Sequence, residues 1–381
     1  TKKGMRWIKI HAANKYGYDK ADFDGRVAFI DNMMPMLERV AEDPLEHVKV
    51  WSEADEPWQF LAAVFALFDE EIAARLPVQA DGSCNGIQHY AAAGRDEIGA
   101  EAVNLIPGDT PNDAYLDVLD AVVHRVQVDA KGGDPTARMI LPLLQNEDKG
   151  RVVVKQPVMC TPYNVTRVGA RDMVKEKLKK FGHAPAGIFK TSDYLATTIF
   201  NSVGDVCVGA REIMTWIEGS VRAMCKADKF RTVRWQSPLG ATVIQPYRNF
   251  RKHKIETVMQ WVTLAERDDL SEVSLRRQVQ GGPPNWVHSQ DGGHAQSTAI
   301  RCYEEDIDAA FIHDGYLTHA ETMDEMNVIL REEFVEQHLM DQVGITHKYW
   351  TDRYPDVDLP DPPAKGSLDL NVVRDSKYFF A

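Results

Sequence analysis

The stretch FIHDGYLTHA, residues 311–320, constrains the fold most, because it places a carboxylate between two short strand-like segments. Asp314 and Gly315 favour a turn, so the stretch predicts a hairpin. One interpretation of Asp314 is a turn residue at the end of a strand. The other is a metal ligand that the hairpin presents. A single aspartate does not decide between the two, so another part of the chain must supply a partner.

Much of the remaining chain shows the spacing of apolar residues that is typical of helices. Residues 21–78, 112–182 and 320–338 are predicted to be mostly helical, and GGPPNWVHSQDGGH, residues 281–294, is predicted to begin as a loop. Residues 231–252 predict a strand, a turn and a second strand. The sequence therefore predicts an α+β fold that is rich in helices and contains a small sheet.

The composition sets broad limits on the class of protein. The 381 residues are 44% hydrophobic and 27% charged, as in a soluble globular protein of two or three domains. The five cysteines form no CxxC pair, which indicates reduced thiols. The longest apolar run, FLAAVFALF, is too short to span a bilayer, and no secretory signal is visible. We therefore expect no membrane partner.

The formal net charge of −13 argues against nucleic acid as the first candidate partner, but the charge is uneven along the chain. Basic residues gather in residues 149–190 and 222–254, whereas acidic residues gather toward the C-terminus. A basic middle region can bind a polyanion locally. The alternative is that these cations only cover solvated helix faces.

Asp81 is the candidate partner for Asp314. It lies in QADGSCNGIQHY, where Gly82 and Gly86 let the backbone approach a ligand closely. Two carboxylates on separate elements fit a Mg²⁺ site that uses few protein oxygens and leaves room for phosphate. Sites of this kind often hold two ions about 3.5–4 Å apart. A phosphate-binding group elsewhere in the chain would strengthen this interpretation.

The segment RVVVKQPVMCTPYN supplies cations for phosphate. Arg151, Lys155, Met159 and Tyr163 follow one another at i, i+4 spacing, which would place them on one stripe of a helix. The guanidinium and the ammonium can bind phosphates, and the aromatic ring lies further along the stripe. The alternative is an exposed basic edge with a buried Met159 and Tyr163. Two carboxylates together with phosphate-binding cations favour a phosphoryl-transfer site.

DGSCNGIQHY, RVVVKQPVMCTPYN and FIHDGY, in this order, resemble motifs A, B and C of the single-subunit DNA-dependent RNA polymerases of T-odd bacteriophages and mitochondria. Further segments are similar to the same family, namely MRWIKIHAAN, EIGAEAVNLIPGDTPNDAY, PPNWVHSQDGGH and PAKGSLDL. The resemblance therefore covers nearly the whole chain. It implies a right-hand polymerase fold, with a small antiparallel sheet in the palm and mostly helical fingers.

The resemblance implies a two-metal site and a triphosphate site. Asp81 and Asp314 would coordinate two Mg²⁺ ions, with the carbonyl of Gly82 as a backbone ligand. The ions would lower the pKa of the RNA 3′-OH and accompany the departing pyrophosphate. Arg151 and Lys155 would bind the triphosphate of the incoming nucleotide, and Lys155 is also a candidate proton donor to the leaving group.

Other positions match the family's nucleotide pocket. Tyr163 would close the pocket and help to sense the sugar, with His288 near the 2′-OH. Tyr115 matches a position in the pocket, and His313 flanks the metal site near the primer end. Lys20, in GYDKADF, matches a basic position near the incoming triphosphate or the early RNA.

Two positions favour ribonucleotides over deoxyribonucleotides. DNA polymerases of the wider superfamily carry a Glu five residues after the motif A aspartate, where it excludes a 2′-OH, and that position is Gly86 here. Those enzymes also tend to have HDE where this chain has His313, Asp314 and Gly315. A template-directed DNA polymerase is the alternative enzyme, and a non-catalytic nucleic-acid-binding fragment is the alternative that is not an enzyme.

Motif B departs from the family pattern in two respects. Asn164 replaces the Gly that usually follows Tyr163, and Asn is the next best residue for a left-handed turn, so the conformation should survive. Pro157 and Pro162 disfavour a continuous helix, and Pro162 biases Thr161 away from helical dihedral angles. We therefore expect a kink before Tyr163.

The family architecture maps residues 1–108 to the palm, 109–288 to the fingers, and 289–381 to the second part of the palm and a C-terminal foot. Within the fingers, residues 231–275 would hold the hairpin that reads promoter DNA in the phage enzymes. Its candidate nucleic-acid contacts, to base edges or only to phosphates, are Arg248, Arg251 and Lys252.

The N-terminal domain and the thumb of the family have no counterpart in this sequence. We expect them to be cut away or supplied by a second polypeptide, and we favour a split, two-subunit phage enzyme. Such an enzyme would act in the cytoplasm of an infected bacterial host, with the mitochondrial matrix as the second choice. The expected partners are the DNA template, the RNA transcript, NTPs and the N-terminal polypeptide.

Overall fold

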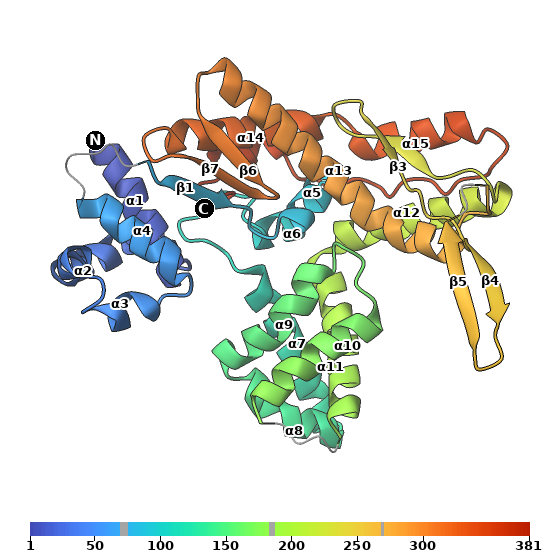
Figure 1. Ribbon diagram of the computed structural model, residues 1–381, viewed down its shortest axis with the longest axis horizontal. Helices are drawn as coiled ribbons and strands as arrows, with labels where there is room; N and C mark the ends of the chain where they lie inside the picture. The colour runs from blue at the N-terminus through green and yellow to red at the C-terminus, as the bar shows by residue number, and fades with distance from the viewer. Residues whose placement is uncertain (69–74, 183–186, 268–269) are drawn as a thin grey trace.

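The stretch around Asp314 forms the predicted hairpin, and Asp81 ends the strand beside it (Figure 1). The antiparallel sheet has the order β1-β7-β6, with β1 (Pro77–Asp81), β7 (Gly315–His319) and β6 (Ala309–Ile312). In its register Asp81 faces Gly315, directly after Asp314. His313 occupies the turn between β6 and β7 with a left-handed φ of 56°. The prediction of a hairpin is confirmed, and the sheet brings two distant parts of the sequence together.

The computed structural model describes residues 1–68, 75–182, 187–267 and 270–381, and most of these residues are helical (Figure 1). The helices before and just after β1 are α1 (Lys2–Tyr16), α2 (Phe23–Glu42), α3 (Val48–Ser52), α4 (Pro57–Phe68), α5 (Asn85–Gly94) and α6 (Glu97–Ala102). α1 packs against α2, α4 and β1. The N-terminal helices therefore support one edge of the sheet.

A second group of helices lies below the sheet in Figure 1. It consists of α7 (Ala114–Lys131), α8 (Pro135–Leu144), α9 (Glu147–Cys160), α10 (Arg167–Lys180) and α11 (Ile188–Val206). Local sequence explains where these helices start: Asp134, for example, accepts hydrogen bonds from the first turn of α8, and Pro135 occupies its first position. The helices predicted within residues 112–182 are confirmed.

The prediction of a loop at the start of residues 281–294 is wrong, because α13 runs from Leu275 to Glu304. Pro283 and Pro284 lie inside this helix and cannot donate to the carbonyls one turn earlier. The carbonyl of Gln280, which Pro284 leaves without its helical donor, accepts the side-chain N–H of Asn164 at 3.2 Å. A tertiary hydrogen bond thus compensates for a break that local sequence would predict.

Two further hairpins follow α12 (Val208–Ala227). β2 (Arg234–Gln236) and β3 (Thr242–Ile244) pair as residues 231–252 predicted, around a turn where Gly240 has a φ of 82°. β4 (Phe250–Glu256) and β5 (Trp261–Arg267) form a longer ribbon that projects from the molecule (Figure 1). Every residue of β4 is exposed.

The C-terminal part covers the sheet with aromatic side chains. Its elements are α14 (Met323–Leu339), α15 (Gln342–Arg353) and the short 3₁₀ helix Leu370–Asp375. Tyr316 of β7 packs edge-on against Phe380, and both are buried. The Tyr316 hydroxyl lies 3.2 Å from Nδ1 of His294, whose Nε2 lies 2.9 Å from the carbonyl of Leu330.

Within the described ranges, no helix has the length and apolar character needed to cross a membrane.

Candidate active site

The fold places Asp81 and Asp314 next to each other at the end of the sheet. The backbone N–H of Gly82 donates to the carbonyl oxygen of Asp314 at 3.4 Å, and that of Ala381 donates to the carbonyl of Asp81 at 3.2 Å. Directly after this point Cys84, with a left-handed φ of 61°, turns the chain from β1 into α5. The two carboxylates come from the end of one strand and from the turn beside it, as the sequence predicted.

The electrostatics of the pair are unfavourable without a cation. Burial, and then the nearby charge of Asp314, raises the pKa of Asp81 from 3.8 to about 6. Asp291 of α13 lies near Asp314. Burial, with a smaller contribution from the charge of Asp314, raises the pKa of Asp291 to about 6, although the side-chain N–H of Asn85 donates to it at 2.6 Å. Three acidic groups therefore gather in one region, and a divalent cation would relieve their repulsion.

The donor set fits Mg²⁺ bound through few protein oxygens. Across the parts of the chain that the structure describes, no group of three or more His, Cys, Asp or Glu side chains could hold a metal. Asp81 and Asp314 offer two carboxylates, and the carbonyl of Gly82 is the expected backbone ligand. Mg²⁺ commonly keeps water or phosphate oxygens in its remaining positions, so this sparse set suits it.

A cavity of about 320 Å³ opens beside the two aspartates and collects most of the predicted site residues. Those that line it are Lys20, Asp81, Gly82, Gly86, Tyr115, Arg151, Lys155, Tyr163 and Asp314. These residues come from the end of the sheet and the turns beside it, from the loop before α2, from α5, α7 and α9, and from the turn after α9. The cavity therefore combines carboxylates with cationic side chains of the kind that the phosphoryl-transfer interpretation requires.

The two cations of α9 share one aromatic neighbour. The guanidinium carbon of Arg151 lies 5.4 Å, and the ammonium of Lys155 5.9 Å, from the ring centre of Tyr115. Because Arg151 and Lys155 are one helical turn apart, they face the same side of α9. This part of the predicted stripe is confirmed.

Tyr163 does not continue that stripe as a helical residue. α9 ends at Cys160, and a turn follows in which Asn164 has a left-handed φ of 55°. The left-handed turn predicted for Asn164 is confirmed. The bias predicted for Thr161 is wrong, because its φ of −62° and ψ of −47° are helical. The chain therefore changes direction after Thr161, and Tyr163 reaches the cavity from the turn.

Of the two predicted histidines, His288 lies directly against this turn. Its ring stacks on Tyr163, with ring centres 4.8 Å apart and an angle of 27° between the planes. Burial, followed by the charge of His313, lowers the pKa of His288. His313 itself lies in the exposed turn beside Asp314. Neither histidine is among the residues that line the cavity.

Gly86 has a tighter environment than the sequence argument assumed. A Cβ at Gly86 would lie 2.8 Å from Cβ of Pro162 and 3.3 Å from the hydroxyl of Tyr163. The missing side chain lets α5 pack against the turn after α9. Glycine is therefore needed at position 86 for the packing of α5 against this turn, independently of any role in sugar selection.

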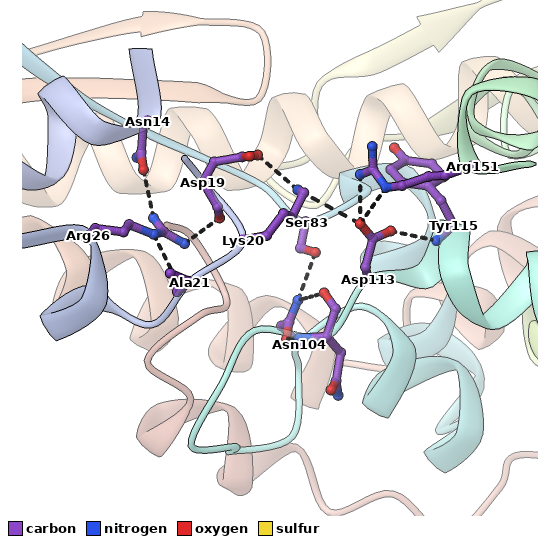
Figure 2. Close-up of polar contacts among 11 residues, drawn as sticks. Asn14, Asp19, Lys20, Ala21, Arg26, Ser83, Asn104, Asp113, Tyr115 and Arg151 are labelled. Atoms are coloured by element: carbon purple, nitrogen blue, oxygen red, sulfur yellow. Dashed lines mark hydrogen bonds and ion pairs between the residues drawn. The ribbon is translucent and has the colours of Figure 1, made fainter. Parts of the chain in front are cut away.

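The structure adds two residues that the sequence did not single out, Asp113 and Arg26 (Figure 2). Asp113 caps α7 and forms an ion pair with Arg151. Arg26 is only 2% exposed, and it donates to the carbonyls of Asp19 and Ala21 on either side of Lys20. An Asp just before a helix is a recognisable capping signal. Local sequence could not predict the pairing of Asp113 with Arg151 or the hydrogen bonds of Arg26.

The three cations predicted to contact DNA lie apart from the cavity lining. Arg248 donates to the carbonyl of Ser271 at 2.7 Å, at the base of the β4–β5 ribbon. Arg251 and Lys252 are exposed on β4. Their side chains therefore lie on the surface, outside the cavity.

Comparisons with known proteins identify the family of the chain. A family model described as DNA-dependent RNA polymerase matches residues 1–358. The chain is 39% identical over 393 residues to DNA-directed RNA polymerase 1, mitochondrial, of Nicotiana sylvestris, covering 100% of this chain and 39% of that protein. It is 38% identical over 392 residues to DNA-directed RNA polymerase 2, chloroplastic/mitochondrial, of Arabidopsis thaliana, covering 99% of this chain and 38% of that protein.

The chain thus spans about two fifths of the length of these relatives. The match runs through the segments that carry both aspartates and the cations of α9. The chain belongs to the single-subunit type of DNA-dependent RNA polymerase and holds its catalytic region.

Proposed function

We propose that the cavity catalyses the template-directed transfer of ribonucleotides from NTPs to an RNA 3′-OH. The observation that carries the proposal is the convergence of Asp81 and Asp314 with Arg151, Lys155 and Tyr163 in one cavity, although they come from three separate stretches of sequence. Two Mg²⁺ ions, held by the two aspartates and the Gly82 carbonyl, would supply positive charge at the 3′-OH and at the triphosphate.

Arg151 and Lys155 bind the triphosphate in this proposal. Both line the cavity that also contains the aspartates, and a guanidinium and an ammonium on one helix face suit adjacent phosphate groups. Lys155 carries N–H groups that can protonate the departing pyrophosphate. Lys20 approaches the same cavity from the loop before α2 and adds a third cation.

Tyr163, Tyr115 and His288 form the nucleotide pocket. The stack of Tyr163 on His288 provides a surface for the sugar, and the imidazole can hydrogen-bond the 2′-OH. Gly86 keeps a side chain away from the same turn. His313, in the turn that carries Asp314, adjoins the place where the RNA 3′ end must meet the carboxylates.

The proposed architecture is a palm formed by residues 1–108 and 289–381 and fingers formed by residues 109–288. The β4–β5 ribbon, within residues 231–275, would contact promoter DNA through Arg248, Arg251 and Lys252. Because the relatives are longer, we propose that a separate N-terminal polypeptide, or an N-terminal part of the same protein, completes the enzyme. One proposed origin is a phage, with action in the bacterial cytoplasm. The other is an organelle, because the names of the relatives are mitochondrial and chloroplastic.

Primer extension on an RNA–DNA hybrid tests the proposal. The protein, alone and then with any co-purifying partner, is given Mg²⁺ and either ribonucleotides or deoxyribonucleotides. We expect extension with ribonucleotides, and loss of extension but not of hybrid binding in Asp81→Asn and Asp314→Asn. Preference for deoxyribonucleotides would favour the DNA polymerase alternative. Synthesis that survives Asp314→Asn would overturn the assignment of the site.

A further inference from the structure

Asp113 joins the start of α7 to a cation on α9. One carboxylate oxygen, Oδ1, accepts the backbone N–H of Tyr115 at 3.0 Å and so caps α7. The other, Oδ2, accepts Nε–H of Arg151 at 2.8 Å and lies 2.6 Å from Nη2 (Figure 2). The side chain of Asp113 is only 9% exposed and that of Arg151 21%, so solvent screens this ion pair less than a surface pair.

The ion pair fixes the direction of the guanidinium. Nε and Nη2 lie on one edge of the planar group, and both face Asp113, so Nη1 belongs to the edge that points elsewhere. Arg151 and Asp113 both line the cavity that contains Asp81 and Asp314. A carboxylate that holds one edge of an arginine leaves the other edge oriented for a ligand.

The same carboxylate also sets the ring beneath the cations. Tyr115, whose N–H is bound by Asp113, places its ring 5.4 Å from the guanidinium of Arg151 and 5.9 Å from the ammonium of Lys155. Lys20 approaches Oδ2 from another element, at 4.0 Å. Asp113 thus lies where cations of α9 and of the loop before α2 meet (Figure 2).

We propose that Asp113 is a positioning residue for nucleotide binding: it holds Arg151 so that Arg151 and Lys155 together bind the triphosphate. This proposal rests on the proposed function for the identity of the ligand. The competing possibility is that Asp113 occupies the triphosphate site in the absence of nucleotide and competes with it. The two possibilities predict opposite changes in triphosphate affinity. Loss of the carboxylate weakens binding if Asp113 positions Arg151, and it strengthens binding if Asp113 competes with the triphosphate.

Asp113→Asn is the most direct variant, because Asn caps a helix as well as Asp but carries no charge. We expect its affinity for ATP, measured by calorimetry with Mg²⁺, to fall about 10-fold, as for the loss of a charge-assisted hydrogen bond. The binding of adenosine, which has no phosphate, should stay unchanged. Asp113→Ser, which keeps a capping oxygen but is too short to reach Arg151, should behave in the same way.

A double-mutant cycle with Arg151→Ala tests whether Asp113 acts through Arg151. If Asp113 acts through Arg151, Asp113→Asn should change ATP affinity less than about twofold in the Arg151→Ala background. An equal loss in both backgrounds would show that Asp113 does not act through Arg151, and a gain of affinity would show competition; either result overturns the proposal. The cycle measures nucleotide binding alone, so a failure of the wild-type protein to make RNA would contradict the proposed function without altering this test.

Discussion

Asp81→Asn should make the metal-free protein more stable while it abolishes RNA synthesis. Burial and the charge of Asp314 raise the pKa of Asp81 from 3.8 to about 6 in the fold. A carboxyl group whose pKa is higher in the folded state binds protons more tightly there, so the fold loses stability as the pH rises from 3.8 to about 6. Asparagine, which carries no charge, avoids this loss.

The gain in stability can be calculated from the difference between the ordinary pKa of Asp81 and its pKa in the fold. About two pKa units correspond to about 3 kcal/mol at 1.36 kcal/mol each. Part of Asp81 is open to solvent in the cavity, which screens its charge, so we expect a gain of about 1–2 kcal/mol. For a chain of this length the entropy of unfolding is about 0.8 kcal/mol per kelvin, so the melting temperature should rise by about 2 °C.

Calorimetry in EDTA at pH 8 and pH 4.5 measures this gain. At pH 4.5 Asp81 is mostly protonated in the fold, so the advantage of Asp81→Asn should shrink to about a third. Mg²⁺ should stabilise the wild-type protein at pH 8 but have little effect on the variant. Asp308→Asn, which alters a side chain that is 95% exposed, is the matched control. A variant that is no more stable than the wild type at pH 8, or a gain that does not change with pH, would refute the electrostatic argument.

Further predictions concern packing, a buried cation and histidines. Gly86→Ala should slow ribonucleotide incorporation several-fold in single-nucleotide extension, because the new Cβ would lie 2.8 Å from that of Pro162; unchanged kinetics would count against this packing. Arg26→Ala should lower the free energy of unfolding by about 2–4 kcal/mol in urea titrations, since it removes three buried hydrogen bonds, and a loss below about 1 kcal/mol would contradict that role. Burial lowers the pKa of three histidines, so the unfolded chain binds protons that the fold does not, and stability should fall as the pH drops from 6.5 toward 4. Equal urea midpoints at pH 7.5 and 5.5 would refute the assignment of the three, which are His89, His294 and His338.

Features that depend on a few neighbouring residues could be predicted from the sequence. The turn of FIHDGYLTHA and the left-handed conformation of Asn164 both follow from the preferences of single residues. The pairing of Asp81 with Asp314 required a second argument, from the chemistry that two carboxylates perform together. The resemblance of both segments to family motifs supported that argument, and the pairing of β1 with β7 brings the two residues together.

Features that depend on distant partners could not be predicted in this way. Pro283 and Pro284 predict a break, but α13 continues, because Asn164 donates to the carbonyl of Gln280 and the helix is buried against its neighbours. The ion pair of Asp113 with Arg151 joins residues from two helices, and no periodicity of the sequence connects them. Local propensity is a weak guide wherever a tertiary contact outweighs it.

The distribution of charge in the site narrows the class of ligand that it can bind. Asp81 and Asp314 lie at the end of the sheet with Asp291 of α13 nearby, whereas the cations of the cavity lining come from α9, α2 and the loop before α2. A divalent cation alone would neutralise the first set but bring no further anion to the cations, of which Arg151 pairs with Asp113 and Lys20 with Asp19. A phosphate alone would do the reverse, and its own charge would be repelled by the carboxylates. A polyphosphate bound together with divalent cations complements both sets at once, which supports the proposal that this cavity binds a nucleoside triphosphate with Mg²⁺.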